Sequence, residues 1–113
     1  MSAILQIQGN FANTPGQIAV GVNISITTPV GAITATALAN GANTISIPTG
    51  TTLILIQLPV GNATAVTLKG VTGDTGLPLN PVGVSMWQPK AAETSFVLTA
   101  GGAIATLTTI TFL

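Results

Sequence analysis

The stretch Gln17-Ile-Ala-Val-Gly-Val-Asn-Ile-Ser-Ile26 shows the pattern on which the fold depends. Large apolar residues occupy every second position, and small or polar residues fill the positions between them. Successive side chains of a β-strand point to opposite faces, so this alternation predicts a strand with one buried face. The same period of two recurs along most of the chain, and it predicts further strands at residues 3–8, 31–38, 43–47, 51–58, 63–69, 82–87, 95–99 and 103–112.

Two of these segments carry additional expectations. Residues 51–58 contain the continuous apolar run Leu53-Ile-Leu-Ile56, which predicts a central strand covered on both faces. In residues 103–112 the alternation places Thr106 and Thr108 on the same face as Ile110.

The segments between these strands are rich in turn-forming residues. Asn40-Gly41 predicts a hairpin, because both residues tolerate positive φ. Residues 70–81 form the longest Gly/Pro-rich loop, and residues 90–93 could hold one helical turn. Eight or nine short strands at intervals of about 8–12 residues predict an all-β fold. We expect a single antiparallel β-sandwich or jelly-roll-like domain over residues 1–113.

Charged residues are almost absent, because Lys69, Asp74, Lys90 and Glu93 are the only four among 113 residues. An ordinary globular domain is about 25% charged. The chain also lacks His, Cys and Arg, so we expect no disulfide, no metal site and no cofactor. With two lysines in all, we expect no nucleic-acid partner. Such an uncharged surface suits a subunit that packs against neighbours, since soluble monomers normally carry charges of mixed sign.

The apolar fraction of 47% raises the question of a membrane span. Polar residues and prolines interrupt every window of about 20 residues that a spanning helix needs. The N-terminal residues also lack a basic segment and a long apolar core, so no signal peptide is predicted. We therefore expect no membrane association and synthesis in the cytoplasm.

One motif points to catalysis, and a simpler interpretation competes with it. Asp74-Thr-Gly76 matches the core of the aspartic-protease signature, but Thr72 and Gly73 stand where that family has apolar residues. The alternative is a Gly-rich turn in which Asp74 bonds nearby backbone. The turn is the favoured interpretation, and we expect the protein not to be an enzyme.

Thr and Trp offer two further alternatives. The 19 Thr residues suggest an ice-binding face, yet the Thr-x-Thr pairs have no fixed period, and β-propensity explains them better. Met86-Trp87 could anchor a partner, or Trp87 could close the end of the core. The four charges could form ion pairs between subunits, or they could simply be solvated.

Three segments resemble small β-rich virion proteins of tailed bacteriophages: Gly50-Thr-Thr-Leu-Ile-Leu-Ile56, Thr67-Leu-Lys-Gly-Val-Thr-Gly-Asp-Thr-Gly-Leu-Pro-Leu79, and Ser95-Phe-Val-Leu-Thr-Ala100 with the terminal Thr-rich strand. The resemblance implies a structural subunit of a phage particle, such as a capsid decoration or cement protein, a head spike or a tail component. It also implies an all-β homo-oligomer, often a trimer, located in the virion and bound to the major capsid protein or another virion protein. It suggests no catalytic residues.

The sequence therefore predicts a non-enzymatic capsid decoration protein, with a tail or head–tail component and a free carbohydrate- or ice-binding module as alternatives. An unpaired N-terminal strand would offer an edge to a neighbour. Together with the 70–81 loop and the Met-Trp pair, it gives the predicted interface residues Ile4, Leu5, Ile7, Lys69, Asp74, Leu77, Leu79, Met86 and Trp87.

Overall fold

The computed structural model describes residues 3–11, 18–26, 30–70 and 73–113. These residues contain strands and no helix, as the alternating pattern predicts. The ten strands are β1 (Ala3–Phe11), β2 (Ile18–Ile26), β3 (Ala32–Leu38), β4 (Gly41–Ser46), β5 (Ile54–Gln57), β6 (Val66–Lys69), β7 (Leu77–Pro78), β8 (Val84–Trp87), β9 (Ser95–Ala100) and β10 (Ile104–Phe112). Nine of them coincide with predicted segments. The tenth, β7, is a two-residue strand inside the predicted 70–81 loop, and its Pro78 is tolerated because β7 lies at a sheet edge.

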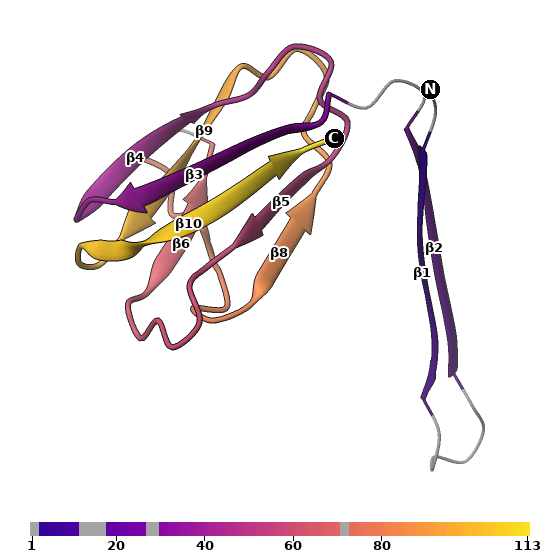
Figure 1. Ribbon diagram of the computed structural model, residues 1–113, viewed down its shortest axis with the longest axis horizontal. Coiled ribbons are helices and arrows are strands. Elements are labelled where there is room, and N and C mark those ends of the chain that lie inside the picture. Colours follow the sequence, from indigo (N-terminus) through magenta and orange to yellow (C-terminus); the bar gives the residue numbers. More distant parts are fainter. Residues whose placement is uncertain (1–2, 12–17, 27–29, 71–72) are drawn as a thin grey trace.

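The strands form three antiparallel sheets (Figure 1). One four-stranded sheet has the order β3-β10-β5-β8, and the other has the order β4-β9-β6-β7. Strands β1 and β2 pair with each other in a separate two-stranded ribbon, which stands beside the two larger sheets in Figure 1. The prediction of an all-β fold with antiparallel sheets is confirmed. Eight strands, β3–β10, make up the two larger sheets, which we call the two-sheet body.

One apolar core lies between the two sheets of this body. Both sheets contribute to a single cluster of buried residues, including Ile56 and Phe112 from one sheet and Phe96 and Leu98 from the other. The aliphatic residues dominate this cluster because the chain contains only 4% aromatic residues. Burial of these faces drives the sandwich-like packing, at about 25 cal/mol for each Å² of apolar surface removed from water.

The corner after β3 differs from the prediction. Asn40-Gly41 does not form a hairpin, because β3 and β4 belong to different sheets. Gly41 has a φ of 94°, and the chain turns there from one sheet to the other. The Asn43 side chain holds this corner. Its Oδ1 accepts a hydrogen bond from the Ala39 N–H at 2.9 Å, and its Nδ2 donates to the carbonyls of Ala39, Gly41 and Leu98 at 2.9, 3.0 and 3.1 Å.

Three smaller expectations are also corrected. Strand β5 is central, between β10 and β8, but its outer face is open because Gln57 is exposed. Thr106 is exposed while Thr108 is fully buried, because the register of β10 against β3 shifts between Ile104 and Thr108. Residues 90–93 form a turn rather than a helical turn. The Glu93 N–H donates to the Lys90 carbonyl at 3.1 Å, and Ala92 has a φ of 70°.

Candidate interaction surfaces

The predicted N-terminal strand is paired along one side only. Ile4, Leu5 and Ile7 lie in β1, opposite Ser25, Ile24 and Val22 of β2. The strand is therefore not unpaired, because β2 pairs with β1 over all nine of its residues. Among the described strands β1 has no second neighbour, so it is still an edge strand, and the predicted contact of this edge with a partner stays a prediction. The sequence shows β1 and β2 as separate strands, and their partnership becomes visible only in the register.

The predicted interface residues in and next to the 70–81 loop have different environments. Lys69 ends β6 and is half-buried, whereas Leu77 in β7 is 62% exposed. Asp74 is exposed, and its Oδ2 accepts a hydrogen bond from the Gly70 N–H at 3.1 Å. The bond matches the proposed turn, although it runs to upstream rather than downstream backbone. Leu79 is half-buried against the core, and its N–H donates to the Val66 carbonyl at 2.9 Å, so it is a packing residue.

Met86 and Trp87 lie on opposite faces of β8. Trp87 packs against the core, with its ring edge-to-face with Phe96 at a centroid distance of 4.8 Å and an interplanar angle of 88°. Met86 is 37% exposed on the outer side of the sheet. Of the two alternatives for Trp87, the geometry supports closure of the core end, and Met86 is the member of the pair that faces outward.

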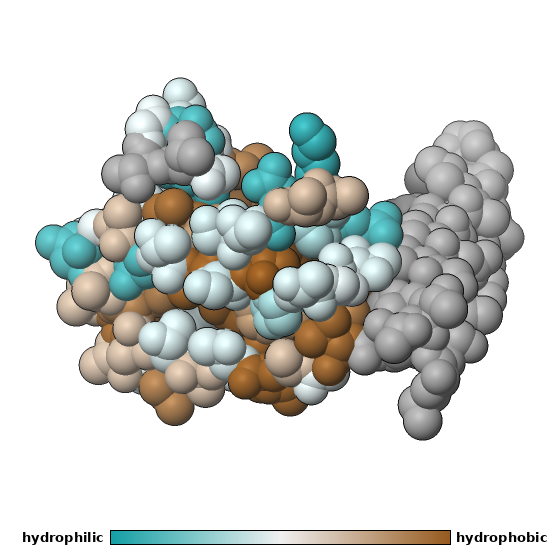
Figure 2. Space-filling model, turned by 90° about the horizontal axis from the view of Figure 1, so that it is seen from above, coloured by the Kyte–Doolittle hydropathy of each residue, from teal (hydrophilic) through white to brown (hydrophobic). Residues whose placement is uncertain are grey.

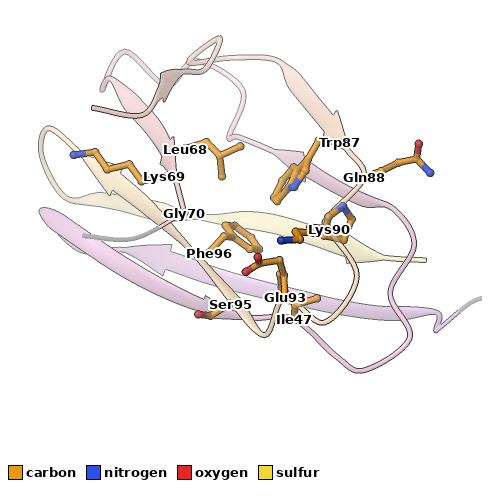
Figure 3. A pocket seen from close by; sticks show the side chains of 11 residues that line it. Ile47, Leu68, Lys69, Gly70, Trp87, Gln88, Lys90, Glu93, Ser95 and Phe96 are labelled. Atoms are coloured by element: carbon orange, nitrogen blue, oxygen red, sulfur yellow. The ribbon is translucent and has the colours of Figure 1, made fainter. Parts of the chain in front are cut away.

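Trp87 and Phe96 also line an open pocket of about 320 Å³ (Figure 3). Leu68 and Ile47 add apolar surface, and the charged residues at the pocket are Lys69, Lys90 and Glu93. In Figure 3, Lys90 and Glu93 lie close to Phe96, whereas the Lys69 side chain extends away from them. Three of the four charged residues thus line one pocket, although they are up to 24 residues apart in the sequence, and the charged groups of two of them, Lys90 and Glu93, lie together.

The outer side of the β3-β10-β5-β8 sheet forms a second surface, which sequence reasoning missed except for Met86. Two rows of residues cross all four strands in register, and none of the eight residues is charged. We call this surface the uncharged face. It consists of the row Ile33, Thr111, Leu55 and Met86, and the row Ala35, Thr109, Gln57 and Val84.

Exposed apolar side chains at both edges of the sheet make the uncharged face unusual. Ile33 in β3 is 68% exposed, and Val84 in β8 is 59% exposed. The view from above in Figure 2 shows pale and brown surface over much of the body, with teal surface in scattered places. The signal in the sequence was the strict alternation of β3 and β8. This alternation could not reveal the uncharged face, because β10 and β5 lie between β3 and β8 in the sheet and the sequence does not show that order.

The described residues hold no helix long and apolar enough to cross a membrane. Within the same residues, no group of three acidic side chains comes together in a way that could hold a metal ion. Comparison with protein-family models found no match, and comparisons with curated proteins and with solved structures found no significant match.

Proposed function

We propose that this chain is a non-enzymatic structural protein of a phage virion, a capsid decoration protein that binds the capsid surface and associates with its own copies. The observation that carries the proposal is the uncharged face, with eight residues in register across four strands. Apolar and Thr side chains on a sheet face cost little free energy to desolvate, because they leave no charge unpaired in an interface. A free monomer gains nothing from such a face, whereas a subunit held against a particle buries it.

The order of the strands supports this proposal at the level of the fold. Counted from β3 as 1 to β10 as 8, the strands pair as 1–8, 2–7, 3–6 and 4–5. This is the pairing of one long antiparallel ribbon folded over a core, and on that basis we propose that the two-sheet body is a jelly roll. Jelly rolls of eight strands occur in viral capsid proteins and in lectins, so the fold is compatible with both a virion protein and a sugar-binding module.

The attachment to particles can be tested with the purified protein. Particles produced without the gene are mixed with the wild-type chain and separated from free protein by density-gradient sedimentation. We expect the chain to sediment with the particles at a fixed copy number, and Leu55→Lys to weaken binding at least about tenfold, because it places a charge at the centre of the uncharged face. The matched control is Thr44→Lys, which adds the same charge to an exposed position of the other sheet.

The same sedimentation distinguishes the head from the tail. Separated heads and separated tails are incubated with the labelled chain, and binding to tails alone would replace the decoration assignment with a tail or head–tail component. Failure of the wild-type chain to bind either part would refute the virion proposal.

The pocket favours a second candidate, a carbohydrate-binding module. An aromatic wall of Trp87 and Phe96 beside Gln88 and Glu93 combines apolar surface with hydrogen-bonding groups, as sugar sites require. Titration with a panel of monosaccharides and disaccharides, followed by Trp87 fluorescence and by amide NMR shifts, would test it. We expect shifts confined to the pocket residues if it binds sugar, and no shift at millimolar sugar would exclude this function.

A further inference from the structure

Strand β3 is an edge strand without the usual protection against pairing with another strand. Its seven residues include no charged residue and no proline, and among the described strands its one neighbour is β10. Ile33, Thr34 and Ala35 are all exposed in succession, so the strand is open on both faces of the sheet at this edge. Natural proteins often protect an edge with a lysine, a proline or a very short strand, because an open edge is a template for a further strand.

The edges on the other side of the two-sheet body do carry such protection. Strand β7 has only two residues, one of which is Pro78, and β8 has four residues and ends just before Gln88-Pro89. All four charged residues of the chain also lie between positions 69 and 93, in the part that contains β7 and β8. Strands β3 and β4 are therefore the unprotected edges of the body, and β3 is the longer one and the one that borders the uncharged face.

The hydrogen bonds at the end of β10 show which backbone groups of β3 point to the open edge. The Leu113 N–H donates to the Leu53 carbonyl at 2.9 Å, and the Leu53 N–H donates to the Leu113 carbonyl at 3.0 Å, so Leu113 directs its backbone groups toward the β5 side. Backbone groups alternate in direction along a strand, so the even-numbered residues from Thr108 to Phe112 direct theirs toward β3, where they pair with even-numbered residues. The odd-numbered residues of β3 therefore point their N–H and C=O groups to the open edge, and these residues are Ile33, Ala35 and Ala37.

We propose that β3 pairs with β3 of a second copy of this chain, antiparallel about a two-fold axis at Ala35. The proposal deepens the self-association in the proposed function and rests on it. In this register Ala35 meets Ala35 and Ile33 meets Ala37, so the three outward N–H groups of each copy donate to the three outward carbonyls of the other. The Ala37 carbonyl already accepts a long bond from the Thr36 hydroxyl at 3.4 Å, and its second lone pair is left for the new donor. A two-fold contact must be complementary to itself, and this edge meets that requirement.

The side chains fit the same register. On the outer face the large Ile33 lies opposite the small Ala37, and on the inner face Thr34 lies opposite Thr36, which is a favourable cross-strand pair. No two charges meet, because the strand has none. The pairing joins the uncharged faces of two copies into one eight-stranded sheet, with a β8 strand at each end. The dimer thus offers a particle twice the uncharged surface of one chain.

Sedimentation velocity of the full chain without particles, over a series from micromolar to millimolar concentration, tests the two-fold register. We expect the wild type to form a dimer that dissociates on dilution. Ala35→Lys and Ala35→Glu should each raise the dissociation constant at least about fivefold, because the axis places like charges directly opposite each other. An equimolar mixture of the two variants should restore the dimer, since residue 35 then meets the opposite charge. The control Thr44→Lys, at an exposed position of β4, should change the constant less than about twofold.

Cross-linking tests which edge pairs. The chain has no Cys, and hydrogen-bonded antiparallel partners have Cα atoms about 5.5 Å apart, which a disulfide can bridge. We expect Ala35→Cys to give a covalent dimer on mild oxidation, and Thr44→Cys to give far less. If Thr44→Cys gives the covalent dimer instead, β4 is the edge that pairs and the proposal is wrong.

The pairing of β3 and the virion function fail separately. A wild-type chain that is monomeric at every concentration overturns the pairing, even if it still binds particles. A mixture of Ala35→Lys and Ala35→Glu that associates no better than either variant alone also overturns it. A chain that dimerises through β3 but binds no particle supports this inference and refutes the virion function.

Discussion

Replacing Thr108 with valine should stabilise the protein, because its hydroxyl is buried without a partner. Thr108 is 0% exposed, and its Oγ1 makes no hydrogen bond. Thr36 lies opposite it on β3, but the Thr36 hydroxyl donates to the Ala37 carbonyl at 3.4 Å. A buried, unsatisfied hydroxyl costs about 1–3 kcal/mol, and valine has nearly the same shape.

We therefore expect Thr108→Val to raise the free energy of unfolding by about 1–2 kcal/mol. For a chain of this length the Tm should rise by about 4–8 °C. Urea unfolding followed by Trp87 fluorescence measures the change, with the m value unchanged. Protein concentration must be equal in all samples, since self-association also stabilises the folded state.

Thr106→Val is the control, because Thr106 lies on the same strand but is exposed. Its effect should stay within about 0.5 kcal/mol. If Thr108→Val leaves the free energy of unfolding unchanged or lowers it, the Thr108 hydroxyl must have a partner, and the reasoning fails.

Three further substitutions test the corners and turns by the same urea assay. Asn43→Ala removes four hydrogen bonds at the corner between the sheets and should lower the free energy of unfolding by about 2–4 kcal/mol. The control Thr44→Ala, at an exposed position, should change it little. Equal effects of the two substitutions would contradict the role of Asn43. Gly76→Ala should lower the free energy of unfolding by about 2–3 kcal/mol, because φ is +79° and an added Cβ would lie 2.8 Å from the Leu68 carbonyl oxygen. Gly73→Ala should leave it nearly unchanged, because an added Cβ would meet open space there. Ala92→Gly should stabilise by about 0.5–1 kcal/mol, since it relieves a positive φ of 70°, and a loss of stability would show that this turn is not strained.

Much of the fold could be predicted because alternation is a local property. Strands β2 and β10 match their predicted segments to within a residue. Their extent could be predicted because the side chains on one face of a strand are always two residues apart, so the alternation of apolar residues marks the strand directly. The pairing of strands could not be predicted. Asn40-Gly41 has the residues of a hairpin turn, but Asn43 and the competing partners of β3 and β4 in the two sheets decide the geometry there.

The candidate surfaces were predicted only in part, for the same reason. Met86 and Trp87 were recognised as a pair, yet only the pleat of β8 in its sheet shows that one faces outward and the other packs on Phe96. Ile33 was not singled out in the sequence, because a single exposed apolar residue is ordinary, and Leu55 was expected to be covered as part of the run Leu53-Ile-Leu-Ile56. They matter when the register brings them into one row with Met86.

By itself, the sequence determined that this protein is built from strands and that almost all of its surface is uncharged. Both follow from composition and a period of two, which any short segment displays. Only the tertiary structure decided which uncharged residues share a face, which three of the four charged residues line one pocket, and that the first two strands form a ribbon of their own. Those features depend on contacts between residues far apart in the chain. The free energy of such contacts comes from the packing of whole sheets, which local preference does not encode.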